Sequence, residues 1–167
     1  MTTPSSLLVD AVGRVHEDLP GLLDGLDDET LRWRPDPAAN PIGWLVWHLT
    51  RVQDDHLAQV GGVEQVWTSQ GFADRFALPY DVGDIGYGQS SDQVGAFRAS
   101  ATDLLAYHAA THELSVRVLE QEQDLDRVVD DRWDPPVTAA VRLVSVVNDI
   151  TQHLGQAAYV RGLLDRR

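Results

Sequence analysis

The side chains of this 167-residue chain that could bind a metal or move a proton are six histidines and 26 acidic residues. Asp149 and His153 are four residues apart in a region with helical periodicity. On a helix, this spacing places two side chains about 40° apart, one turn above the other. Two residues of one helix can then bind one ion, as in zinc motifs with two histidines on a helix.

Spacing alone leaves other interpretations open. An ordinary ion pair within the helix is an equal alternative for Asp149 and His153. Arg142 lies on the same stripe and could neutralise the aspartate. His108 and His112 are also four residues apart on an apolar stripe. The pattern therefore gives two candidate helical pairs and does not choose between them.

A third ligand must come from another helix. His48 lies beside Leu45 and Val52, at the edge of an apolar helical face. A single histidine on such a face is more often a hydrogen-bonded core residue than a ligand, and this stays the alternative for His48. His56 faces the core more fully, and we interpret it as a packed histidine.

The elements that must position these residues are predicted to be four long helices. Thr3-Pro4 opens a first helix, which Pro20 should bend or divide. Asn40-Pro41 opens a second helix that continues to about Val60 and ends at Gly61-Gly62. The apolar residues of both recur at steps of three and four, as core-facing helices require.

The third helix is predicted to start at Ser90, because Ser90 and Gln93 have the spacing of a capping box. Its apolar stripe continues to Leu119, and a fourth helix runs from near Thr138 to about Leu164. No segment alternates convincingly as a strand would. We therefore expect an all-α fold, a four-helix bundle that forms a single domain over residues 1–167.

The connection from Gly61 to Ser90 is unusually long and rich in aromatic residues. We expect it to be ordered, to span the bundle and to cover one of its ends. Trp67, Phe76 and Tyr80 would then wall a pocket over the metal, with a satellite core or a dimer contact as the equal alternative. The five aromatic residues of the connection are Trp67, Phe72, Phe76, Tyr80 and Tyr87.

Charge and composition exclude several function classes. The formal charge is −13, and this opposes binding to nucleic acids and anionic membranes. The chain has no cysteine, which excludes disulfides, thiolate zinc sites and cysteine nucleophiles. All 13 basic residues are arginine, so a Schiff-base lysine is excluded as well. No segment has the pattern of a targeting signal or a membrane span, and we expect a soluble, cytoplasmic protein.

The run Trp44-Leu45-Val46-Trp47-His48-Leu49, together with Asp149-x-x-x-His153-x-Gly155-Gln156, resembles the DinB/YfiT-like superfamily. Members are four-helix bundles that bind a divalent metal through a histidine of the second helix and two residues of the last. The usual late motif is His-x-x-x-His-x-Gly-Gln, so Asp149 departs from it. The resemblance implies that His48, Asp149 and His153 are the metal ligands, with a coordination position left open.

More closely, the chain resembles the actinobacterial branch of mycothiol-dependent transferases. The resemblance implies zinc as the metal, with nickel as the alternative, and mycothiol as the cosubstrate. The metal would lower the pKa of the thiol, and the thiolate would attack an electrophile. The resemblance covers nearly the whole chain, and the segments that carry it are Trp33–Pro37, Trp47–His56, Arg132–Val137 and His153–Ala158.

Five further residues are expected near the substrate: Arg34, Arg51, Asp55, Tyr80 and Arg142. The arginines could bind carboxylates or sugar hydroxyls of the thiol, although a solvated or ion-paired surface position is the commoner alternative for each. Asp55 lies two turns from His48, about 10.5 Å along the helix, so a substrate or supporting role suits it better than ligation. We expect a homodimer. The alternative function is a non-catalytic, metal-binding, dimerising bundle of the stress response.

Overall fold

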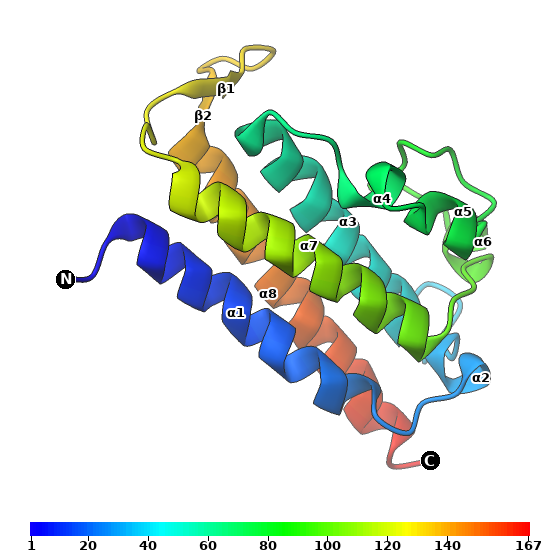
Figure 1. The fold of residues 1–167 in the computed structure, drawn as a ribbon. Coiled ribbons are helices and arrows are strands. Elements are labelled where there is room, and N and C mark those ends of the chain that lie inside the picture. Colours follow the sequence, from blue (N-terminus) through cyan, green and yellow to red (C-terminus); the bar gives the residue numbers. More distant parts are fainter.

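A computed structural model describes all 167 residues. Its four long helices are α1 (Pro4–Leu23), α3 (Ile42–Gly61), α7 (Ala101–Gln121) and α8 (Ala139–Leu164), and they lie side by side as a bundle (Figure 1). α3 packs against α7 and α8, and α1 packs against the same two helices. The predicted all-α four-helix bundle is confirmed.

Two details of the first helices differ from the prediction. α1 runs through Pro20 without dividing, because the proline lies in the last turn and disturbs few backbone hydrogen bonds. α3 begins at Ile42 with Pro41 as its N-cap, and no side chain caps it, so the expected cap by Asn40 is wrong. The end of α3 is as predicted, with Gly62 in the left-handed conformation at φ 62°.

The third long helix starts later than predicted. The capping box of Ser90 and Gln93 is present, but it opens only the short helix α6 (Ser91–Gly95). α7 begins at Ala101, where the Ser100 hydroxyl caps the backbone N–H of Asp103. Between the two helices, Phe97 packs 5.9 Å from Trp47 with almost no exposure, so burial of this ring accompanies the break.

The long connection is ordered, as expected. It contains the short helices α4 (Val66–Ser69) and α5 (Phe72–Phe76) before α6. It lies along the side of α3 and α7 and not over an end of the bundle, which corrects the expected position (Figure 1). The buried Asp54 carboxylate of α3 anchors α4 by accepting the N–H groups of Val66 and Trp67, at 2.8 and 2.7 Å.

The remaining elements are small. α2 (Asp28–Leu31) lies between α1 and α3. An antiparallel hairpin of β1 (Val128–Asp130) and β2 (Val137–Thr138) precedes α8, and the sequence analysis missed it because strands of three and two residues are too short to show alternation. No helix combines the length and the apolar character needed to cross a membrane.

α3 is the central helix of the molecule. Sixteen of its 20 residues are buried, because α7 and α8 cover one side of it and the long connection covers another. This explains why α3 can carry buried polar groups such as His48, Arg51 and Asp54. Each of them needs protein partners, since a buried polar group without a hydrogen bond is costly.

Candidate metal centre

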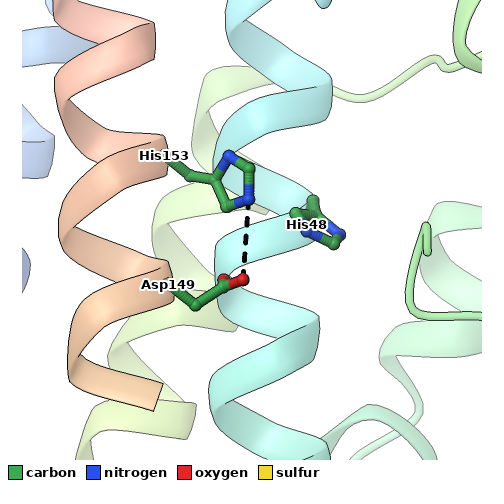
Figure 2. A group of neighbouring side chains, drawn as sticks. All are labelled: His48, Asp149 and His153. Carbon is green, nitrogen blue, oxygen red and sulfur yellow. Dashed lines mark ion pairs between the residues drawn. The ribbon is translucent and has the colours of Figure 1, made fainter. Parts of the chain in front are cut away.

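His48, Asp149 and His153 come together where α3 packs against α8 (Figure 2). Each offers one ligand atom, and these atoms all lie within 4.8 Å of one another. The Nε2 atom of His153 is 3.6 Å from Oδ2 of Asp149. The His48 and His153 rings meet nearly at right angles, with centroids 4.6 Å apart. Side chains far apart in the sequence thus present a compact set of donors.

The other helical pair has a different environment. His108 and His112 face His16 of α1, and the three rings form a stack. The His16 and His112 rings are 4.3 Å apart and almost parallel, at 4°. Lone pairs lie in the plane of each imidazole, so stacked parallel rings do not direct them at one ion. The pair that meets a third ligand is Asp149 and His153.

Both imidazoles at the candidate centre are oriented by carbonyl oxygens. His48 Nδ1 donates to the backbone oxygen of Ile85 at 2.5 Å, and His153 Nδ1 donates to Oε1 of Gln156 at 3.0 Å. A carbonyl oxygen only accepts, so each ring carries its proton on Nδ1 and keeps a lone pair on Nε2. Metal-binding histidines typically have this second hydrogen bond.

The Asp149 carboxylate has an unsatisfied atom. Its Oδ1 is buried and has no hydrogen-bond partner. A buried carboxylate oxygen without a partner costs free energy, and a cation beside it would remove that cost. Two imidazole nitrogens and a carboxylate oxygen form a donor set that suits zinc or a similar divalent ion. The residues present therefore fit the metal that the sequence resemblance implies.

The pKa values of His48 and His153 shift in opposite directions. Burial lowers the pKa of His48, which keeps this ring neutral and able to bind a metal. The Asp149 carboxylate, with Oδ2 3.6 Å from Nε2, raises the pKa of His153. A metal ion at Nε2 of His153 would therefore compete with a proton for the same lone pair, because a histidine ligand must be unprotonated at the ligating nitrogen.

A groove of about 750 Å³ adjoins the candidate centre, and we name it the arginine groove. Ile85 and Ser145 connect it to the centre, because Ile85 bonds to His48 and Ser145 lies one turn before Asp149. Polar and aromatic side chains dominate its lining: Asp55, His56, Gln65, Tyr87, Asp130, Arg132, Trp133 and Arg142. Tyr87 and Trp133 are largely exposed there.

A second groove, of about 720 Å³, lies farther along α3 and α8 in the opposite direction, and we name it the amide groove. Gln156, which bonds to His153, and Leu45, one turn before His48, connect this groove to the centre. Asn40, Gln152 and Tyr159 also line this groove. The candidate centre therefore lies between two grooves of different chemistry.

Of the five residues expected near the substrate, Asp55 and Arg142 line the arginine groove. Arg142 Nη2 donates to Oδ2 of Asp130 at 3.0 Å, while its Nε is buried without a partner. Asp55 accepts from His56 and from Gln65, at 2.9 and 2.8 Å.

The other three expected residues contact protein atoms elsewhere. Arg34 donates to Ser91 and ties α6 to the segment before α3. Arg51 is completely buried and donates to Gln65 Oε1 at 2.9 Å and to the Tyr107 hydroxyl at 3.2 Å. The Tyr80 hydroxyl donates to the carbonyl of Gln93 at 2.7 Å. None of these three lines either groove.

The chain matches the family model of Mycothiol-S-transferase (MST) over residues 7–166. It belongs to this family. A solved structure described as a conserved protein from Enterococcus faecalis is similar, with 29% sequence identity, a TM-score of 0.89, and 100% of each chain covered. No curated protein gives a significant match to the chain. The expected DinB/YfiT-like relationship is confirmed by the family and by the fold.

The aromatic residues of the connection divide between the core and the arginine groove in this family member. Trp67 and Phe76 are buried and pack on Tyr107, with ring centroids 5.1 and 5.9 Å from it. The ring of Tyr80 lies 5.4 Å from that of Trp47. These rings extend the core and do not wall a pocket over the centre, so the structure favours the alternative of a satellite core. Tyr87 alone of the five lines the arginine groove.

Sequence reasoning gave no role to three groups that hold the two histidines. Gln156 was part of the motif, but only the structure reveals its bond to His153. Trp44 also belongs to a quoted run, and its ring stacks on His48 at 4.8 Å. The Ile85 carbonyl left no signal in the sequence, because any residue has a backbone oxygen.

Proposed function

We propose that this member of the MST family is a metal-dependent thiol S-transferase that activates mycothiol, or a similar low-molecular-weight thiol, for attack on an electrophile. The observation that supports this most directly is the convergence of three ligand atoms, from His48, Asp149 and His153, beside a polar groove. Three protein ligands leave a coordination position for a substrate, as in catalytic zinc sites.

Zinc is the expected ion, with nickel as the alternative, and either would supply positive charge that lowers the pKa of a thiol. His48 and His153 would hold it through Nε2, while Ile85 and Gln156 keep both rings oriented. Asp149 would contribute the negative charge that balances the cation. In the overall reaction, the thiol releases its proton, its sulfur bonds to the electrophilic carbon, and the leaving group departs with the bonding electrons.

The arginine groove is the proposed site for the polar part of the thiol. Arg132 and Arg142 can donate to carboxylate or hydroxyl oxygens, and Asp55 can accept from hydroxyl groups. Exposed Tyr87 and Trp133 offer apolar ring faces beside them. A polyhydroxylated thiol would find both kinds of contact there, and its sulfur would reach the centre past Ser145.

The test is a transfer assay with metal-loaded protein. Mycothiol and other small thiols are each incubated with an electrophile such as monobromobimane, and the conjugate is followed by mass spectrometry. We expect conjugate formation that depends on the metal and on His153. If the wild type forms no conjugate with any thiol under either metal, the catalytic proposal fails, and a metal that only stabilises the bundle becomes the better account.

We also propose that the protein is a homodimer. The exposed residues of α8 between Val141 and Tyr159 include no charged side chain, although the chain carries a net charge of −13. Val144 of α8 is exposed and lines a groove together with Leu8 of α1 and Val147. Two copies of so acidic a chain can approach best through an uncharged face. Light scattering should give the dimer mass for the wild type and the monomer mass for Val144→Asp.

A further inference from the structure

We propose that Asp84 and Gln89 are positioning residues that fix the orientation and the tautomer of His48. Both lie in the segment Asp84–Gln89 of the long connection, which we name the strap. The inference rests on the proposed function in so far as His48 is a metal ligand. The strap is far in sequence from the motif residues, so the sequence alone does not indicate this role.

The strap touches His48 directly through its backbone. The carbonyl oxygen of Ile85 accepts from Nδ1 of His48 at 2.5 Å. Gly86, the next residue, has a φ of 92°, and a Cβ atom there would lie 2.7 Å from His48 Nδ1. Only glycine permits both this backbone conformation and this close approach. The position of the Ile85 carbonyl therefore depends on the shape of the strap.

Asp84 determines that shape through both of its carboxylate oxygens. Oδ1 accepts the backbone N–H of Gly86 at 2.7 Å, and Oδ2 accepts Nε2 of Gln89 at 2.7 Å. The first bond closes a tight turn around Ile85, and the second joins the two ends of the strap. An aspartate that accepts twice thus holds the Ile85 carbonyl towards His48.

Gln89 extends the network to the face of the imidazole. Its Oε1 accepts Nε1–H of Trp44 at 2.8 Å. The Trp44 ring is stacked on the His48 ring, with centroids 4.8 Å apart and planes at 9°. Gln89 therefore fixes the surface on which the imidazole lies, while Ile85 fixes the direction of its Nδ1–H bond. Together these contacts point Nε2 of His48 at α8.

The strap is anchored to α3 near the histidine itself. Arg51, three residues after His48, donates from Nε to the backbone oxygen of Asp84 at 3.3 Å. Its guanidinium lies over the Trp67 ring at 5.0 Å and is completely buried. Arg51 was expected near the substrate. In the structure it anchors the strap to α3 instead.

Asparagine cannot replace Asp84 in this network. An amide at position 84 offers one acceptor and one donor group, whereas Gly86 and Gln89 both donate to it. Turning the Gln89 amide only moves the conflict, because Trp44 also requires an acceptor from Gln89. Asp84→Asn therefore breaks one hydrogen bond of this network in either orientation of the two amides.

The experiment compares Asp84→Asn with Asp81→Asn, a matched control whose exposed carboxylate in the same connection makes no hydrogen bond. The first readout is the histidine nitrogen spectrum of the metal-free protein, which reports the tautomer of His48. The second is the zinc dissociation constant. We expect Asp84→Asn to give a mixture of tautomers and to weaken zinc binding about 10- to 100-fold, as loss of a ligand's hydrogen-bond partner does. Asp81→Asn should behave as the wild type does.

If Asp84→Asn does not fold, Gln89→Leu carries the same test, with Gln70→Leu as its control. The proposal is overturned if His48 keeps a single Nδ1–H tautomer and zinc affinity stays within twofold of wild type in the folded variant. A wild type that binds no zinc would contradict the proposed function instead. The tautomer spectrum would still decide the role of the strap, since it needs no metal.

Discussion

Asp149 and His153 face each other across one turn of α8, with Oδ2 3.6 Å from Nε2, while the second carboxylate oxygen is buried without a partner. An ordinary ion pair would leave that oxygen unsatisfied, and this favours a cation as the missing partner. His48 approaches the same point from α3. The role of Asp149 as a ligand can be tested apart from that of the histidines.

Asp149→Asn keeps the shape of the side chain and removes its charge. We expect zinc affinity to fall by at least about 10-fold, because a neutral amide oxygen is a poorer ligand than a carboxylate. The pKa of His153 should also fall, since Asp149 is the main cause of its elevation. Competition with a chelating dye measures the first effect, and NMR titration of the metal-free protein measures the second. Unchanged zinc affinity would rule out direct ligation by Asp149.

Arg142→Gln should weaken thiol binding and leave the metal in place. Arg142 lines the arginine groove but offers no ligand to the centre. We expect KM for the thiol to rise about 10-fold, equivalent to about 1.4 kcal/mol, with metal content unchanged. The control is Arg14→Gln, which breaks the exposed ion pair with Asp10 on α1. A KM that both variants leave at the wild-type value would place the thiol elsewhere.

Tyr107→Phe should destabilise the fold without affecting the centre. The buried hydroxyl donates to Oδ2 of Asp54 at 2.8 Å and accepts from Arg51, so its loss leaves buried polar groups with fewer partners. The expected cost is about 1–3 kcal/mol in the free energy of unfolding. Tyr87→Phe is the control, because the Tyr87 side chain is exposed and makes no hydrogen bond. Urea unfolding of both variants checks the prediction, and equal midpoints would contradict it.

The histidine stack should make stability depend on pH. Burial, and then the neighbouring His16 and His112, lower the pKa of His108 from 6.5 to about 3. As the pH falls below 6.5, the unfolded chain takes up a proton at His108 that the folded chain refuses until about pH 3. Stability is therefore lost as the pH falls through this window, by at most about 1.4 kcal/mol per pH unit for one group.

His108→Asn removes this titrating group and can keep a bond to the Thr50 hydroxyl, which lies 3.1 Å from Nδ1. We expect the free energy of unfolding to fall less steeply with decreasing pH in this variant than in the wild type. Urea unfolding in the presence of a chelator removes any contribution from the candidate centre. Parallel slopes for both proteins would show that His108 is not the source of the acid sensitivity.

Local signals allowed the ends of most helices to be predicted. Thr3, Gly62 and Thr138 act at the helix ends where the sequence indicated them. The capping box at Ser90 was also real, yet it opened a helix of five residues. A cap reports where a helix starts and not how long it runs, and here burial of Phe97 coincides with the break before α7.

The candidate centre required information that the spacing of residues lacks. Asp149–His153 and His108–His112 have the same separation, and only the packing of α8 on α3 brings one pair to His48. The other pair meets a histidine of α1 and becomes a stack. Arg51 is a second example, since it was expected near the substrate and the long connection buries it completely. Tertiary contacts decided both cases.

The most direct test of the account is the metal content of purified protein after dialysis against zinc. It predicts one ion per wild-type chain, a sharp loss in His48→Ala and in His153→Ala, and retention in His108→Ala and in His112→Ala. Circular dichroism should confirm that each variant is folded. Loss of the metal in the His108 and His112 variants, with retention in His48→Ala and His153→Ala, would contradict the account and move the centre to the histidine stack.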